Sequence, residues 1–114
     1  MAEHNLSGQK GEDRACMFLI DKGYEILQRN YRYRRSEIDI IAMKGNLIAF
    51  VEVKYRSKNN FGDPEISVNE KKEQQVLIGA ENYLFEKDWN GEVRFDIISI
   101  LGDHSIDHFE DAFG

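Results

Sequence analysis

The sequence predicts one mixed α/β domain built from two helices and five strands. Its 114 residues suit a single domain. Apolar residues recur at helical spacing in two segments, and short segments rich in β-branched and aromatic residues alternate with turns. A helix between the third and fourth strands allows those two strands to run parallel. The expected elements are a helix over 7–22, strands over 24–33, 36–43 and 47–56, a helix over 67–87, and strands over 92–100 and 106–109.

The first helix places a carboxylate on its apolar side. We expect the helix to begin at Ser7, a good N-cap, and to end before Gly23, which suits a left-handed stop. Glu12 precedes Cys16 by four residues and Leu19 by seven, so all three lie on one stripe. A carboxylate directed at the core is unfavourable unless something neutralises it. Glu12 is therefore a candidate functional residue, and extension of its side chain to solvent is the alternative.

The second helix is expected to open with a capping box, Ser67-Val68-Asn69-Glu70, in which Ser67 is the N-cap. Val76 and Tyr83 lie seven residues apart on its apolar face. Lys71 and Lys72 fall in the first turn, where the helix dipole disfavours cations. We interpret these two lysines as a solvated helix end, and contact with phosphate is the alternative.

The second and third strands form a hairpin whose register brings charges together. Gly45-Asn46 suits a two-residue turn. Counting away from this turn places Asp39 opposite Glu52 and Glu37 opposite Lys54, with opposed Cβ atoms about 5 Å apart. The other face is expected to be apolar and covered by a helix; it carries Ile38, Ile40, Ala42, Ala49, Val51 and Val53.

Two opposed carboxylates in a sheet repel each other, which indicates a cation that resolves the repulsion. Lys54 can neutralise only one of them. If Glu12 joins Asp39 and Glu52, a hard divalent ion suits the oxygen ligands, and magnesium, with manganese as a substitute, fits better than zinc. A lysine ammonium beside such a metal can steady an attacking water and the charge that develops on a phosphate. The alternative is an ordinary surface ion pair between Glu52 and Lys54.

The charge distribution separates a basic segment from an acidic remainder. The whole chain has 15 Lys and Arg against 21 Asp and Glu, a net charge of −6, which argues against bulk attraction to nucleic acid. Residues 29–58 nevertheless carry eight basic and three acidic side chains. This segment predicts a local anion-binding surface, and a solvated charged face is the alternative. Its candidate nucleic-acid contacts are Arg32, Arg34, Arg35, Arg56 and Lys58.

Other features exclude several classes of protein. Cys16 is the only cysteine, so an intramolecular disulfide and a multi-cysteine zinc site are excluded. The first residues lack the basic and apolar parts of a secretory signal, and no apolar segment approaches the roughly 20 residues of a membrane span. We therefore expect a cytoplasmic protein with no membrane partner. Arg94 and Asp96 share a strand face, as either a structural pair or a support for the site.

The chain carries the stretches GQKGE (8–12), EIDIIA (37–42), FVEVKYR (50–56), FGDP (61–64), KK (71–72), RFD (94–96) and DAF (111–113). Together they resemble the YraN-type family of predicted bacterial endonucleases, within the PD-(D/E)xK, Holliday-junction-resolvase-like superfamily. The resemblance implies a restriction-endonuclease-like αβββαβ core, with a mixed sheet flanked by helices and a short extra C-terminal strand. It also implies Glu12, Asp39 and Glu52 as catalytic metal ligands and Lys54 as the catalytic lysine. Glu37 is implied as a residue that supports these ligands from outside. Ser36 departs from the family, which usually has glycine before EID.

The resulting hypothesis is a magnesium-dependent endonuclease that acts on DNA, with branched DNA as a candidate substrate. A homodimer would enlarge the DNA-binding surface and place two active sites across a two-fold axis. Two alternatives stay open. One is a catalytically inactive nucleic-acid-binding module that uses the basic segment, and the other is a structural or adaptor protein with a nuclease-like fold.

Overall fold

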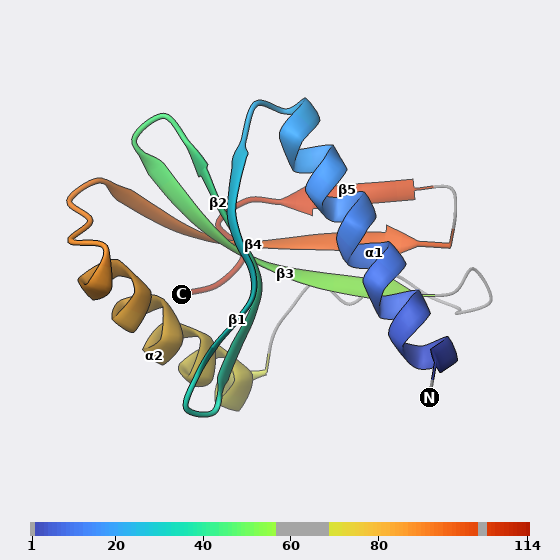
Figure 1. The fold of residues 1–114 in the computed structure, drawn as a ribbon, viewed down its shortest axis with the longest axis horizontal. Coiled ribbons are helices and arrows are strands. Elements are labelled where there is room, and N and C mark those ends of the chain that lie inside the picture. Colours follow the sequence, from blue (N-terminus) through green and yellow to red (C-terminus); the bar gives the residue numbers. More distant parts are fainter. Residues whose placement is uncertain (1, 57–68, 103–104) are drawn as a thin grey trace.

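The computed structural model describes the backbone of residues 2–56, 69–102 and 105–114, and the side chains of these residues except 2–10 and 56. The helices and strands follow the predicted order (Figure 1). Within this part of the chain, no helix is both long enough and apolar enough to cross a membrane. The elements are α1 (Ala2–Asp21), β1 (Glu25–Tyr33), β2 (Ser36–Lys44), β3 (Leu47–Arg56), α2 (Glu70–Glu86), β4 (Glu92–Leu101) and β5 (Ser105–Phe109).

The five strands form one mixed sheet in the order β1-β2-β3-β4-β5. Neighbouring strands are antiparallel except β3 and β4, which are parallel, as α2 between them predicts. The mixed α/β fold is confirmed, and it is compatible with a restriction-endonuclease-like core.

The two helices cover two separate cores. In Figure 1, α1 crosses in front of β3 and β4, and α2 lies beside the β1–β2 ribbon. The α1 core includes Leu19, Ile40 and Val51, whereas the α2 core includes Phe50 and Tyr83. Each strand of the hairpin therefore contributes to both cores, because successive side chains point to opposite faces.

Both helices begin at residues other than those predicted. The α1 helix begins at Ala2 and continues through Ser7, so Ser7 is not its N-cap. The preceding residues extend the helix, and one interior Ser is only mildly unfavourable. The α2 helix begins at Glu70, and Asn69 rather than Ser67 is the N-cap: its Oδ1 accepts the Lys72 N–H at 2.8 Å. Asn caps as well as Ser does, and Ser67 itself lies outside the described residues.

The predicted end of α1 and the hairpin turn are confirmed. Gly23 has φ +96° and donates its N–H to the carbonyl oxygen of Ile20 at 2.9 Å. In the hairpin, Lys44 pairs with Leu47, and the ladder continues in the predicted register as far as Ile40–Val51.

Beyond Ile40–Val51 the predicted register is wrong. The expected pairs Asp39–Glu52 and Glu37–Lys54 are not part of the ladder. Asp39 Oδ2 instead accepts the main-chain N–H of Val53 at 2.7 Å, so a side chain replaces a main-chain acceptor between the strands. Ile38 also leaves the predicted face, because it packs in the α2 core. The two strands separate here, and the carboxylates lie at the point of separation.

Candidate functional site

Asp39 occupies the gap between β2 and β3. Its hydrogen bond to the Val53 N–H fixes one carboxylate oxygen. Burial raises the pKa of Asp39, although this hydrogen bond and the Lys72 charge oppose the increase; the Glu12 and Glu37 charges add to it. The side chain therefore lies within electrostatic reach of carboxylates from α1 and β2 and of a cation from α2.

Glu52 is a buried carboxylate with incomplete hydrogen bonding. The residue is only 6% exposed. Burial, followed by the adjacent Asp39 charge, raises the pKa of Glu52 from its ordinary 4.5 to about 8, against the opposing effect of Lys72. Glu52 Oε1 lies 3.3 Å from Lys72 Nζ, while Oε2 is buried with no hydrogen-bond partner among the residues that the structure describes. A buried oxygen without a partner is unfavourable, and a cation would satisfy it.

Lys72 is a further residue of this site, and the interpretation of this lysine as a solvated helix end is wrong. It was expected at a solvated helix end, yet its ammonium contacts Glu52 across the gap between α2 and β3. The Lys72 side chain remains 42% exposed, so its ammonium contacts both the buried Glu52 carboxylate and the solvent. The signal that could have identified it is its place in the first turn of α2, where a cation opposes the helix dipole and needs another reason to be there.

Glu12 points inward as predicted, but it binds cationic and amide groups of β1. Its Oε1 accepts hydrogen bonds from Arg29 Nε and Asn30 Nδ2, both at 3.0 Å. Asn30 has a left-handed backbone with φ +53°, which places its amide in this contact. Arg29 thus neutralises the carboxylate that the helical stripe directs toward the core. Through the described part of the chain, no three His, Cys, Asp or Glu side chains converge as a metal site.

Lys54 and Glu37 take different places around the carboxylates. Lys54 follows Glu52 by two residues in β3, so both side chains lie on the same face of the strand. In the sheet register Lys54 pairs with Ser99 of β4. Glu37 is half-exposed and forms an ion pair with Arg32 of β1, with Oε2 3.0 Å from Nη2. The predicted Glu37–Lys54 pair is therefore replaced by Glu37–Arg32, because β2 keeps its register with β1 where it separates from β3.

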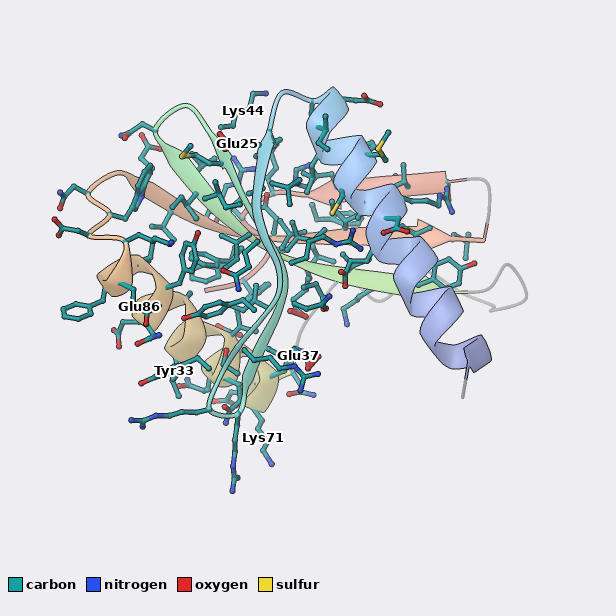
Figure 2. The ribbon with its side chains drawn as sticks, in the orientation of Figure 1. Glu25, Tyr33, Glu37, Lys44, Lys71 and Glu86 are labelled. Carbon is teal, nitrogen blue, oxygen red and sulfur yellow. The ribbon has the colours of Figure 1, made fainter. Side chains whose placement is uncertain are left out.

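The predicted basic contacts divide into two groups. Arg32, Arg34 and Arg35 are exposed on and next to the turn between β1 and β2. Arg34 has a left-handed backbone with φ +57°, and its guanidinium lies 5.2 Å from the centroid of the Tyr33 ring. Figure 2 shows Tyr33 at this turn, with Lys71 and Glu37 also at the lower side of the molecule. The Arg56 side chain and all of Lys58 lie outside the described part of the structure.

A second charged cluster is structural rather than part of the site. Asp96 is fully buried and accepts two hydrogen bonds from Arg94, at 2.8 and 2.7 Å. It also contacts His108 Nε2 at 2.8 Å and accepts the Asp111 N–H at 3.0 Å. Burial would raise the pKa of Asp96, but these hydrogen bonds outweigh it and lower the pKa to about 2. The cluster fastens the C-terminal segment to β4.

The fold and the site together define a class: a mixed α/β protein with a pair of carboxylates, one buried and one partly buried, where its central hairpin opens between two helices. Residues 11–100 match the family described as "Uncharacterised protein family UPF0102". The chain is 47% identical to a UPF0102 protein of Christiangramia forsetii, over 99% of this chain and 98% of the relative. It is 45% identical to one of Flavobacterium psychrophilum, over 99% and 98%, and 41% identical to one of Cytophaga hutchinsonii, over 96% and 97%. The chain belongs to the UPF0102 (YraN) family, which confirms the family that the motifs predicted.

Proposed function

We propose that this protein is a metal-dependent endonuclease that hydrolyses DNA phosphodiester bonds, with branched DNA as the first substrate to examine. The observation that carries the proposal is the pair of a partly buried Asp39 and a buried Glu52, held where β2 and β3 separate and faced by Lys72. A protein retains two adjacent carboxylates with little access to water at a cost in stability, since desolvation and mutual repulsion oppose ionisation of both. Such groups cluster at functional sites.

The residues present fit magnesium. Every donor at the site is a carboxylate oxygen, the ligand type that magnesium takes, and Glu52 Oε2 is buried without a partner among the described side chains. Asp39 and Glu52 would hold the ion, and Glu12 would join them if Arg29 released it. Bound there, the ion would supply Lewis-acid stabilisation of charge on a phosphate.

The protein groups have separate tasks in the proposed reaction. A water oxygen bonds to phosphorus as one P–O ester bond breaks, and the departing oxygen gains a proton. Lys54 is assigned to steady the water and the developing charge on the phosphate. The Val53 N–H holds Asp39 in one orientation, which keeps the site preorganised. Arg32, Arg34 and Arg35 are assigned to phosphates along the strand.

One observation favours a second candidate, a nucleic-acid-binding module without catalysis. Glu12 is held by Arg29 and Asn30. If Glu12 stayed in these contacts, only two protein carboxylates, Asp39 and Glu52, would bind the ion. The basic turn between β1 and β2 would then bind DNA without cleavage.

Cleavage assays separate these functions. Supercoiled, linear, flapped and four-way DNA are incubated with the purified protein and magnesium or manganese. The proposal expects nicking or cutting by wild type and a loss of at least about 100-fold in rate for Asp39→Asn and Lys54→Ala. Asp107→Asn, which changes an exposed carboxylate on β5, is the matched control and should cut like wild type. DNA binding without cleavage under all of these conditions would support the binding module instead.

A further inference from the structure

A cavity of about 420 Å³ lies outside the carboxylate site, between the β1–β2 turn and the outer face of α2. Figure 2 shows Tyr33 at the turn end of this region and Glu86 farther along α2. The volume falls within the range of small-ligand pockets, about 300–1,000 Å³. Its lining residues are Tyr33, Arg34, Ile78, Glu81, Asn82 and Phe85.

The apolar lining of this cavity faces solvent. Phe85 is 83% exposed and Ile78 is 45% exposed, although both lie on a helix whose other face is well packed. Single exposed apolar residues are ordinary, but here two of them line one hollow together with Tyr33. An exposed aromatic side chain that lines the same cavity as a second aromatic ring is suited to stacking on a flat ligand.

The cavity is also bordered by cationic residues that the local structure does not require. A two-residue turn between strands favours Asn and Gly, because left-handed backbone is readily available to them. The turn here is Arg34-Arg35, and Arg34 adopts φ +57°. Arginine in a left-handed conformation is uncommon, and strain of this kind is found where function requires it. The Arg34 guanidinium lies against the Tyr33 ring, so the cation and the aromatic surface are presented together.

We propose that this cavity binds an unpaired nucleobase of the nucleic-acid substrate. The inference rests on the proposed function and adds to it a class of substrate. The base would stack against Phe85 and Tyr33, and Arg34 would contact the adjoining phosphate. Glu81 and Asn82 supply the polar groups that can bond to a base edge. The Asn82 amide is already oriented, since its Nδ2 donates to Tyr31 Oη at 2.8 Å.

Charge complementarity favours this occupant over an apolar one. The exposed cations at the turn are Arg32, Arg34 and Arg35. Arg32 is paired with Glu37, whereas Arg34 and Arg35 are available to attract phosphate and would have no role beside a lipid tail or an apolar helix. A nucleotide uses both components of the surface, the aromatic rings through its base and the arginines through its phosphate.

The position of the cavity implies where the unpaired base lies relative to the cut. With a rise of 1.5 Å per residue, Ile78 and Phe85 lie about 9 and 20 Å along α2 from Lys72. One DNA strand advances about 3.4 Å per nucleotide. The cavity is therefore about three to six nucleotides from the carboxylate pair. A junction, flap or gap near the cleaved bond would supply such an unpaired base.

Binding measurements without cleavage test the cavity. Two fluorescein-labelled DNAs are compared in calcium buffer by anisotropy: a perfect duplex, and the same duplex with a short unpaired tail. Phe85→Ala should weaken binding of the tailed DNA by about 5- to 150-fold, the range expected for loss of one base–aromatic stack. Binding of the perfect duplex should change less than about twofold. Phe85→Tyr, which keeps a stacking ring, should bind the tailed DNA like wild type.

The matched control is Met17→Ala, since Met17 is an apolar side chain of α1 with 61% exposure and is remote from the cavity. It should leave both affinities unchanged. Equal weakening of both DNAs by Phe85→Ala, or no change in either, would overturn the inference. A fall in molecular mass on Phe85→Ala, measured by analytical ultracentrifugation, would also overturn it, because the face would then bind a second copy.

The design separates this inference from the proposed nuclease. If no DNA is cut but Phe85→Ala still selectively weakens binding of the tailed DNA, the inference about the cavity is supported and the protein is a binding module. If DNA is cut and Phe85→Ala binds both DNAs like wild type, the proposed nuclease function is supported and the inference about the cavity is wrong. Absence of any DNA binding at low salt would overturn both.

Discussion

Glu52 combines two properties that usually exclude each other, deep burial and an adjacent like charge. Its 6% exposure removes water from the carboxylate, and Asp39 lies beside it. Lys72 compensates only one of its two oxygens, at 3.3 Å. Because the charged form is unfavourable, burial and the Asp39 charge raise the pKa of Glu52 to about 8. The carboxyl is protonated in the metal-free folded protein at neutral pH, whereas it is ionised when unfolded.

This difference predicts how stability depends on pH without metal. The folded state binds an extra proton between about pH 4.5, the ordinary pKa, and about pH 8. Stability is therefore greatest at the acidic side of this window and is lost as the pH rises through it. Burial raises the pKa of Asp39 in the same direction. We expect Tm in EDTA to fall by about 10 °C from pH 5 to pH 8.

Glu52→Gln provides the control for this measurement, because it keeps the side-chain volume and removes the titration. Its Tm in EDTA should exceed that of wild type at pH 8 and should vary less across the window. Thermal unfolding followed by circular dichroism over this pH range gives both curves. Parallel curves for the two proteins would show that Glu52 does not have the raised pKa.

The sequence could locate these carboxylates but not their surroundings. Counting from the Gly45-Asn46 turn places Asp39 near Glu52, because hairpin register is fixed by turn length. It could not show that the Asp39 side chain would replace a main-chain acceptor for Val53, since this depends on how the strands separate. The helical stripe predicts that Glu12 points inward. Its capture by Arg29 and Asn30 depends on a left-handed residue in β1 that no composition rule requires.

At the scale of the elements, α2 reaches the site because it packs very closely on the first residues of β2. A Cβ added to Gly79 would lie 2.7 Å from Ser36 Cβ and closer still to Ser36 Oγ. Ser36 is 2% exposed, and its Oγ has no hydrogen-bond partner within the described structure. Two small residues thus allow the helix and strand to approach, and Lys72, seven residues earlier in α2, is held over Glu52. The chain order predicts the helix but not this contact, which joins distant segments.

We predict that Gly79→Ala destabilises the protein by about 1–3 kcal/mol, the usual effect of overpacking, despite a gain in helix propensity of about 1 kcal/mol. Ser36→Gly provides the space for the added methyl group, because the Ser36 side chain is what that group would meet first. The double variant should therefore recover most of the lost stability. Urea unfolding of the four proteins gives the coupling energy. Additive effects of the two substitutions would contradict the close contact.

For the whole molecule, the candidate ligands come from three elements that only the folded chain brings near one another. Asp39 is on β2, Glu52 on β3 and Glu12 on α1. An ion bound among them would connect the α1 side of the sheet with the gap between the hairpin strands. The unfolded chain cannot hold these groups together, so binding would favour the folded state alone.

The last prediction follows from this linkage. Magnesium or manganese at a hundredfold excess over Kd should stabilise wild type by about 2.7 kcal/mol, an increase in Tm of about 10 °C or more for a domain of this size. Asp39→Asn should lose most of the increase, and Glu12→Gln should lose part of it only if the ion recruits Glu12 from Arg29. Asp107→Asn, on the exposed side of β5, should respond like wild type. Differential scanning calorimetry at pH 8, where about half of Glu52 is ionised, measures these shifts without any need for cleavage. An equal increase in wild type and Asp39→Asn would place the ion elsewhere on the acidic surface and would remove the metal site from the proposed mechanism.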